Sequence, residues 1–393
     1  MMHLEFINLL KKSIGDFKSH DKSTVYLHEP KIDKKDWSSV KKCLERNFVS
    51  TVGNYVNEFE QKLKKITKSK YVVAVINGTS ALHISLVLLG VKRNDEVLMP
   101  SLNFVASANA VNYCNAVPHF VEIEESTLGV NPIKLKEYLK KIVIFKNGKP
   151  FNKNTKRKIS CLILLHLFGH PSQVDTIKKV TKKFNIPLLE DAAESLGSYY
   201  KKKHLGTFGD LGVLSFNGNK IITTGGGGAI LTNNKKLAER LKYLSTTAKI
   251  PHKWKYEYSE VGYNYRLPGI NAALGCSQLS KLKSFINLKR KLFFIYDKNF
   301  SKSKNFKMFK EPINSKSNYW LQTLILKKKS FKLRNKIINY SNVKGFSTRP
   351  VWKTLHKLKH FRKSPKMKLN ITENLEERII NLPSSAYLGA HKF

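Results

Sequence analysis

Two segments of the chain place reactive side chains directly after apolar runs. Asp191 follows the run 186–189, and Ser215 follows a second run that begins at Leu211. Lys220 lies five residues after Ser215. Short apolar runs of this kind predict buried strands of a parallel sheet, and ligands bind at the carboxyl ends of such strands. We therefore expect a carboxylate, a hydroxyl and an amine to meet in one site.

This combination of groups suits the binding of pyridoxal 5'-phosphate. An amine forms a Schiff base with this cofactor, a carboxylate keeps the pyridine nitrogen protonated, and a hydroxyl contacts the phosphate. Taken separately, Lys220 would be assigned to the surface of a lysine-rich chain, and Asp191 to a helix N-terminus. Their shared context favours the cofactor, so Lys220 and Asp191 are the predicted catalytic residues.

The charge of the chain is strongly positive. Its 393 residues include 71 Lys or Arg and 28 Asp or Glu, which gives a formal net charge of +43. Nucleic acid and anionic membranes are therefore candidate partners. However, the excess is mostly lysine and is spread along the chain, and neither a zinc-finger spacing nor a basic heptad occurs. Nucleic acid is not the expected partner, and a non-enzymatic basic nucleic-acid-binding protein remains an alternative.

The cysteines and apolar runs favour a cytoplasmic protein. The four cysteines contain no CxxC pair, which argues for a reducing compartment and against a metal site. No apolar run reaches the length of a membrane span, and residues 1–15 lack the pattern of a signal peptide. We expect neither a bound metal nor a membrane partner.

The order of expected elements predicts an α/β protein. Expected strands at 71–75, 96–99, 120–123 and 161–165 alternate with helices, which implies parallel strands joined by crossover helices. We expect three parts: an N-terminal segment over 1–55 that packs with the small domain, a large cofactor-binding domain over 56–267, and a small C-terminal domain over 268–393. In the small domain, a long helix should run from Pro268 towards Asp297, with a strand at 319–326 and a helix at 373–380.

Two predictions concern the N-terminal segment. Residues 1–24 are polar and lysine-rich, so we expect them to be loosely attached. Residues 36–46 should form a helix with Trp37, Val40 and Leu44 on one apolar side.

The segment Asn77-Gly78-Thr79-Ser80 joins an expected strand to a helix. Small and hydroxyl-bearing residues at a helix N-terminus bind anions well, because free N–H groups and the helix dipole point the same way. An ordinary helix cap is the commoner explanation for a single Thr-Ser pair.

Four segments together resemble the DegT-type nucleotide-sugar aminotransferases, which use pyridoxal phosphate on the fold type I scaffold. They are Asn77-Gly78-Thr79-Ser80-Ala81-Leu82, Glu190-Asp191-Ala192-Ala193, Ser215-Phe216 with Lys220, and Gly262-Tyr263-Asn264-Tyr265-Arg266. The resemblance runs from about Leu27 to the C-terminus. It implies a mostly parallel central sheet flanked by helices, and a smaller α+β C-terminal domain.

The resemblance also implies roles for individual residues. Lys220 corresponds to the Schiff-base lysine and Asp191 to the partner of the pyridine nitrogen. The implied cofactor-binding residues are Gly78, Thr79, Ser80 and Ser215 at the phosphate, Phe104 over the ring, Glu194 near the cofactor hydroxyl, and Asn264, which reaches the phosphate from the neighbouring subunit. A homodimer with shared active sites follows. Many members have glutamine where this chain has Glu194, and a carboxylate at that position needs a proton or another partner.

The flanking segments resemble one subgroup. Residues 27–30, 48–53 and 191–200 are similar to enzymes that aminate UDP-linked 2-acetamido-4-keto-2,6-dideoxyhexoses for legionaminic acid or bacillosamine synthesis. The implied activity is transfer of an amino group, from glutamate, to the 4-keto carbon of such a UDP-linked sugar. Another nucleotide-sugar aminotransferase, differing in sugar, position or nucleotide, is the alternative. A sugar dehydratase of the same fold carries histidine in place of the lysine, so Lys220 argues against it.

Three histidines are assigned structural rather than catalytic roles. His166 and His170 follow a predicted strand and are expected to support the site from behind, and His83 lies on an apolar helix face.

Overall fold

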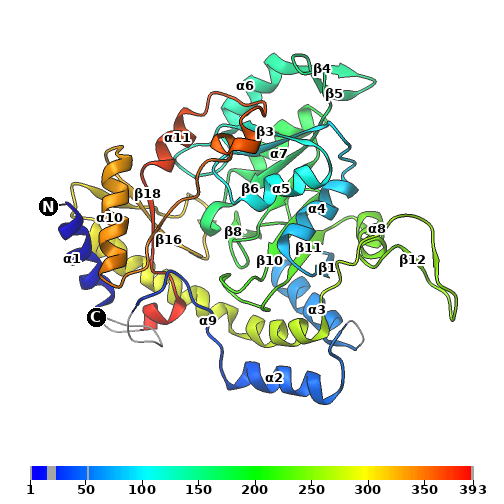
Figure 1. The fold of residues 1–393 in the computed structure, drawn as a ribbon, viewed down its shortest axis with the longest axis horizontal. Helices are drawn as coiled ribbons and strands as arrows, with labels where there is room; N and C mark the ends of the chain where they lie inside the picture. The colour runs from blue at the N-terminus through cyan, green and yellow to red at the C-terminus, as the bar shows by residue number, and fades with distance from the viewer. Residues whose placement is uncertain (1, 16–23, 51–52, 391–393) are drawn as a thin grey trace.

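The central sheet has seven strands, formed by the apolar runs of the sequence (Figure 1). The computed structural model describes residues 2–15, 24–50 and 53–390. In sheet order the strands are β1 (Tyr71–Val75), β11 (Gly228–Thr232), β10 (Leu211–Ser215), β7 (Leu188–Asp191), β6 (Ile159–Leu165), β2 (Glu96–Pro100) and β3 (Val117–Val121). Neighbours from β10 to β3 run parallel, whereas β11 is antiparallel to both β1 and β10. The predicted α/β fold with a mostly parallel sheet is confirmed.

Helices cover both faces of this sheet, because its strands present apolar side chains in both directions. In β1, Val72 and Ala74 join one buried cluster, and Val73 and Val75 join the other. The first cluster includes α3 (Tyr55–Thr67), α6 (Pro132–Ile142), α7 (Val174–Lys183) and the first half of α9 (Gly269–Phe300). The second includes α4 (Gly78–Leu88), α5 (Val105–Tyr113) and α8 (Lys235–Ser245). The parallel strands thus end together between two helical layers, where ligands bind in such folds.

A second sheet lies beyond the central one, along the far half of α9 (Figure 1). Its antiparallel strands are, in order, β14 (Phe306–Met308), β16 (Gln322–Leu326), β18 (Ile379–Leu382) and β17 (Arg349–Pro350). Helices α1 (Met2–Ile14) and α10 (Phe331–Val343) share a third buried cluster with this sheet. The expectation of a loosely attached N-terminus is wrong for α1, because Phe6, Leu10 and Ile14 are fully buried. The other part of that expectation, residues 16–23, lies outside the described residues.

Helix α2 (Lys34–Glu45) forms where it was predicted, but it packs through a different side. Trp37 and Leu44 of the expected apolar side are 62 % and 46 % exposed. The buried side includes Asp36, which accepts a hydrogen bond from Gln278 of α9 at 2.9 Å and forms an ion pair with Lys281. Polar contacts therefore hold α2 on α9 and leave its apolar side open.

The C-terminal elements differ from the prediction in their bounds. The strand expected over 319–326 begins at Gln322. The helix expected over 373–380 is α11 (Asn370–Glu376), and Ile379 already belongs to β18. Ile379 and Ile380 are fully buried in pairing with β16, so sheet formation takes precedence over helix extension there.

Short strand pairs and turns complete the chain. They are β4 (Val143–Lys146) with β5 (Lys149–Asn152), β8 (Tyr199–Tyr200) with β9 (Lys203–His204) and β15 (Ser315–Lys316), β12 (Lys249–Ile250) with β13 (Glu257–Tyr258), and the 3-10 turns η1 (Leu167–Gly169), η2 (Leu355–Lys357), η3 (Lys359–Phe361) and η4 (Ala386–Ala390). The hairpin of β12 and β13 extends away from the body of the molecule (Figure 1). Within the described ranges, no helix is long and apolar enough to cross a membrane, and no group of three His, Cys, Asp or Glu could hold a metal ion.

Candidate active site

A cavity of about 310 Å³ lies at the carboxyl ends of β6, β7 and β10. It is bounded by the N-terminus of α4, by the loop after β2 and by two tryptophans of the C-terminal part. The residues around it that carry polar or aromatic groups are Asn77, Thr79, Asn103, Phe104, Ser107, Asp191, Glu194, Ser215, Asn217, Asn219, Lys220, Trp320 and Trp352. Most of the predicted site residues therefore meet in one place.

Lys220 occupies the loop that follows β10, and its side chain is 14 % exposed. Its Nζ lies 3.8 Å from Oε1 of Glu194 and 4.0 Å from the centre of the Trp320 ring. Burial lowers the pKa of the amine, and the negative charges of Glu194 and Asp191 oppose that effect. A partly desolvated amine of this kind is suited to act as a nucleophile and a base.

Asp191 is the last residue of β7 and is 4 % exposed. Its Oδ2 accepts a hydrogen bond from the Ser107 hydroxyl at 2.6 Å, and its Oδ1 accepts one from the Ala193 N–H at 3.2 Å. Burial raises its pKa, and these two hydrogen bonds act in the opposite direction. No helix begins directly after Asp191, since the next element is β8, so the helix-cap interpretation of this residue is wrong.

Glu194 stands beside Lys220 with 4 % of its surface exposed. Burial raises the pKa of its carboxyl group to about 7, although the Lys220 amine and the Phe168 N–H, which donates to Oε2 at 2.7 Å, favour the ionised form. Glu194 therefore carries a proton for part of the time at neutral pH. A carboxylate at this position was expected to need a proton or another partner, and the raised pKa makes a bound proton available.

The start of α4 provides a cradle for an anion. The Asn77 side chain accepts a hydrogen bond from the Ser80 N–H at 2.7 Å and so caps the helix. A Cβ on Gly78 would lie 3.0 Å from the Ser215 Cβ, so glycine allows the helix terminus to approach β10. Gly78, Thr79 and Ser215 border the cavity, whereas Ser80 does not. Ser80 therefore belongs to the first turn of α4 without bordering the cavity.

The loop after β2 carries Asn103 and Phe104 to the opposite wall. The Phe104 ring is 50 % exposed and lies 5.7 Å from the ring of Trp352. Asn103 is 1 % exposed, and neither its Oδ1 nor its Nδ2 has a hydrogen-bond partner among the described residues. A buried amide without a partner is costly, and such groups point to a bound ligand.

Sequence reasoning missed several residues of this cavity, among them Asn103, Ser107, Trp320 and Trp352. The two tryptophans come from the C-terminal part, more than a hundred residues from Asp191, and no local pattern linked them to the site. Ser107 could have been found from its place in the first turn of the alanine-lined helix that follows Phe104.

Asn264 lies outside this cavity. It is exposed, and its Oδ1 accepts a hydrogen bond from the Arg266 Nε at 3.1 Å. The histidines also lie outside: His166 contacts Oε2 of Glu190 at 3.0 Å, His170 is fully buried, and His83 contacts the Tyr265 hydroxyl at 3.0 Å. Burial lowers the pKa of His170 to about 3, so it is neutral at physiological pH.

The cavity fits pyridoxal phosphate at each of its ends. The α4 terminus with Gly78 and Ser215 offers N–H and hydroxyl donors to a phosphate. Asp191 would supply the buried carboxylate for a ring nitrogen, and Lys220 would supply the amine for the aldehyde carbon. Phe104 provides an aromatic face. The donor set therefore matches what the cofactor requires.

Comparison with known proteins identifies the family of the chain. The model of the DegT/DnrJ/EryC1/StrS aminotransferase family matches residues 30–392. GDP-perosamine synthase of Escherichia coli O157:H7 is 34 % identical, over 91 % of this chain and 92 % of that protein. UDP-4-amino-4,6-dideoxy-N-acetyl-beta-L-altrosamine transaminase of Campylobacter jejuni is 32 % identical, over 77 % of this chain and 76 % of that protein.

Solved structures share the fold. The PLP form of the putative sugar aminotransferase Spr1654 from Streptococcus pneumoniae has a TM-score of 0.82, covering 92 % of this chain and 93 % of that chain at 22 % identity. The predicted fold type I architecture and the pyridoxal phosphate cofactor are both confirmed. The chain belongs to the DegT/DnrJ/EryC1/StrS aminotransferase family and is a pyridoxal-phosphate-dependent enzyme.

Proposed function

We propose that this enzyme transfers an amino group from glutamate to the 4-keto carbon of a UDP-linked 2-acetamido-2,6-dideoxy sugar. One observation carries the proposal: Lys220, Asp191 and Glu194 meet in a single cavity beside an anion-binding helix terminus. When bound, pyridoxal phosphate supplies a ring that withdraws electrons from the carbon next to the transferred nitrogen.

The residues of the chain divide the remaining work. Lys220 holds the cofactor covalently and, once released, takes a proton at Nζ and returns it to a neighbouring carbon. Asp191, oriented by Ser107, keeps a proton on the ring nitrogen through its negative charge. Glu194 donates or accepts a proton at the cofactor hydroxyl, because its pKa of about 7 allows both states at neutral pH.

The sugar and the nucleotide are the finer part of the proposal. The segments 27–30, 48–53 and 191–200 resemble the enzymes that act on UDP-linked acetamido sugars, and the C. jejuni relative is named for a UDP-linked amino sugar that carries an N-acetyl group. The second candidate is a GDP-linked keto sugar. It is favoured by the E. coli relative named for GDP-perosamine, which is similar to this chain over a larger share of its length.

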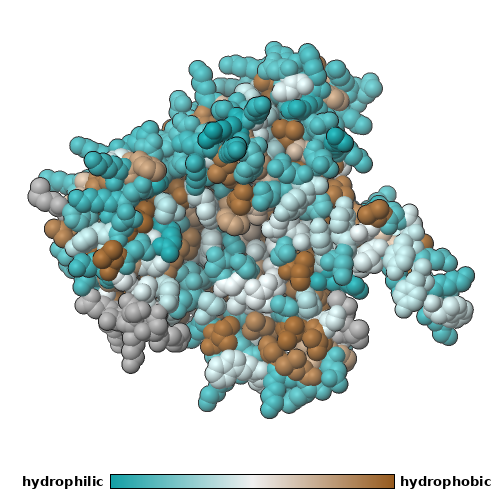
Figure 2. Space-filling view, in the orientation of Figure 1, coloured by the Kyte–Doolittle hydropathy of each residue, from teal (hydrophilic) through white to brown (hydrophobic). Residues whose placement is uncertain are grey.

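We extend the proposal to a cytoplasmic homodimer with shared active sites, in which Asn264 contacts the phosphate bound in the other subunit. Three features support it. Asn264 is exposed and does not border the cavity of its own chain. Leu44 and Val49 are exposed near α2, where Figure 2 shows apolar side chains gathered on the surface. The extended β12–β13 hairpin exposes Trp254 and Tyr256 to 71 % and 76 %.

An amination assay tests the proposed substrate. The purified enzyme is incubated with glutamate and, in separate reactions, with UDP-, GDP- and TDP-linked 4-keto-6-deoxy sugars, with and without a 2-acetamido group. Mass spectrometry should detect an amino sugar from the UDP-linked acetamido substrate and none with Lys220→Ala. An amino sugar from the GDP-linked substrate alone would establish the second candidate, and no product from any sugar would contradict both.

A further inference from the structure

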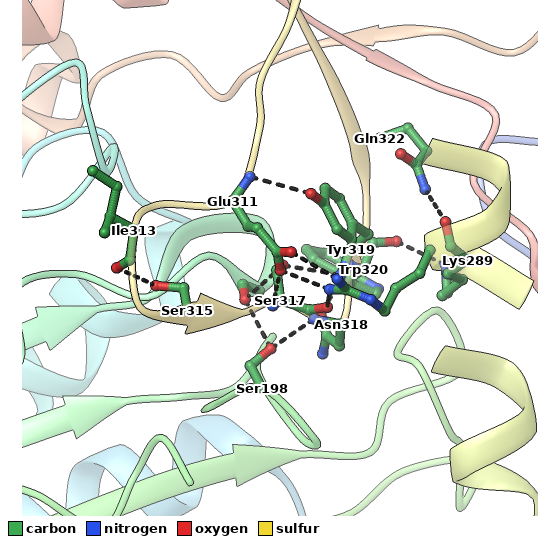
Figure 3. Close-up of polar contacts among 12 residues, drawn as sticks. Ser198, Lys289, Glu311, Ile313, Ser315, Ser317, Asn318, Tyr319, Trp320 and Gln322 are labelled. Carbon is green, nitrogen blue, oxygen red and sulfur yellow. Dashed lines mark hydrogen bonds and ion pairs between the residues drawn. The ribbon is translucent and has the colours of Figure 1, made fainter. Parts of the chain in front are cut away.

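The segment 311–322 connects the C-terminal sheet to the cavity and is fixed by hydrogen bonds along its length (Figure 3). At its start, Glu311 binds the Arg290 guanidinium through two contacts of 2.6 Å. At its end, Gln322 donates to the Lys289 carbonyl oxygen at 2.9 Å, and the Lys289 Nζ donates to the Trp320 carbonyl oxygen at 3.0 Å. Lys289 and Arg290 both belong to α9, so the segment is held against one long helix.

Asn318 joins this segment to the loop that follows Asp191. Its Nδ2 donates to the carbonyl oxygens of Glu194 and Leu196 at 2.9 and 3.0 Å, and its N–H donates to the Ser198 hydroxyl at 2.9 Å. Its Oδ1 accepts a hydrogen bond from the backbone N–H of Trp320 at 2.8 Å. Because Asn318 is fully buried and its amide is satisfied on both sides, it fixes Trp320 relative to the Glu194 loop.

Trp320 in turn contacts Lys220 and the residue before it. Its Nε1 donates to the Asn219 carbonyl oxygen at 2.7 Å, and its ring centre lies 4.0 Å from the Lys220 Nζ. Only 3 % of Trp320 is exposed. The indole therefore faces the amine and is anchored to the backbone that carries it.

We infer that Trp320 is a positioning residue for Lys220: its indole, carried by a backbone that Asn318 fixes and anchored to the Asn219 carbonyl oxygen, holds the amine inside the cavity whenever the amine is not bonded to the cofactor. This inference rests on the role proposed for Lys220. A lysine stem is flexible, and proton transfer at one carbon needs the amine within a narrow range of positions. An aromatic face attracts an ammonium ion, so Trp320 restrains the amine in addition to the Glu194 carboxylate, which lies 3.8 Å away.

Charged groups around the Lys220 amine also affect its pKa, and the effect of Trp320 comes in addition to theirs. Glu194 and Asp191 favour the ammonium form, whereas burial disfavours it. Burial, together with the positive charges of Lys289 and Lys220, lowers the pKa of His28 well below its usual value, so this imidazole is neutral. The Trp320 face favours the ammonium form, and its removal should lower the pKa of the Lys220 amine.

The test measures the Lys220 pKa in the cofactor-free full chain. The rate at which a lysine-selective reagent modifies Lys220 is followed against pH, and the modified peptide is quantified by mass spectrometry. Trp320→Leu should lower the pKa by about 0.5 to 1 pH unit, the size expected for one cation–π contact. Trp320→Phe keeps a weaker aromatic face and the packing, so it should give a smaller decrease. Trp352→Leu removes an indole from the same cavity without touching the amine, and should leave the pKa unchanged.

A second measurement uses the holoenzyme. Trp320→Phe should lower kcat about tenfold while the KM for glutamate stays within a factor of two, because positioning acts on the proton transfer. An unchanged Lys220 pKa in both Trp320 variants, or an equal decrease in Trp352→Leu, would overturn the inference. The modification experiment needs neither cofactor nor sugar, so its failure is distinct from failure of the proposed function.

Discussion

The carboxyl end of β7 and the segment 246–266 are both expected to contact the cofactor. Only the first borders the cavity of its own chain. Asp191 and Glu194 are each 4 % exposed and are hydrogen-bonded to neighbouring groups within the cavity. In the other segment Asn264 is exposed, and Val261 is 86 % exposed. We therefore propose that chemistry at the ring depends on residues of one subunit, and that the phosphate contact of Asn264 depends on a second one. Variants at the two regions should fail in different ways.

The largest effect is expected at Lys220. Lys220→Ala removes both the covalent attachment and the proton carrier, so amination should fall by at least about 10⁴-fold, the upper range for one acid–base group. Borohydride reduction of the wild-type holoenzyme followed by peptide mapping should find the label on Lys220. Lys236→Ala, which removes an exposed lysine of α8, is the matched control and should keep full activity. A label on another lysine would contradict the assignment.

Asp191→Asn should have the next largest effect. Asparagine keeps the shape and can still accept the Ser107 hydrogen bond, but it lacks the charge that stabilises a protonated ring nitrogen. We expect cofactor binding to persist and the proton-transfer rate to fall about 10²- to 10³-fold, which is about 3 to 4 kcal/mol. Single-turnover kinetics of the cofactor-loaded variant measure this rate. Near-normal turnover would remove Asp191 from the mechanism.

The same comparison explains what the sequence could predict. The strands end in Asp191 and Ser215 because apolar runs are buried on both sides, and their order is visible in the sequence. Glu194 was singled out because its type differs from the usual glutamine, and the expectation that it needs a proton or another partner stays a prediction. Trp320 and Asn318 could not be found, because their contacts with Lys220 and Glu194 join residues about a hundred positions apart or more.

The predictions for α1 and for the buried side of α2 were wrong for a different reason. Residues 1–24 were judged by composition and residues 36–46 by periodicity, without knowing which neighbours they meet. In the structure, α1 buries Phe6 beside α9 and α10, and α2 turns Asp36 inward to Lys281. The division into 1–55, 56–267 and 268–393, and the assignment of each site residue to the cofactor, stay predictions.

Mixing two variants tests whether Lys220 and Asn264 of one site come from different subunits. Asn264→Ala should reduce activity about tenfold by loss of one phosphate contact of roughly 1.5 kcal/mol. Mixing it with Lys220→Ala should form hybrid dimers in which one of the two sites has both residues, restoring about a quarter of wild-type activity. Activity is measured after subunit exchange has been verified by native mass spectrometry. Exchange without recovery would show that Asn264 does not act across subunits.

Glu194 should make the cofactor-free protein less stable as pH rises. Its pKa is raised from 4.5 to about 7, so between these values the folded protein holds a proton that the unfolded chain has lost. The unfolded state then binds fewer protons, and the free energy of unfolding falls with pH by up to about 3 kcal/mol. Denaturant unfolding at pH 5 and at pH 7.5 measures this difference. Glu194→Gln should remove most of it, and an equal pH dependence in both proteins would show that Glu194 is ionised throughout.

The smallest effect is expected at Asn103, where stability and binding should change in opposite directions. The Asn103 amide is buried and has no partner among the residues that the structure describes, so the folded protein bears the cost of desolvating it. Asn103→Leu has a similar shape and no polar group, and should stabilise the cofactor-free protein by about 1 kcal/mol. If the amide contacts the ligand, the same change should weaken binding about threefold to tenfold, the range for one neutral hydrogen bond. Absorbance titration with pyridoxal phosphate and the KM for the sugar show which ligand is contacted. Reduced stability together with unchanged binding of both would mean that Asn103 has only a structural role.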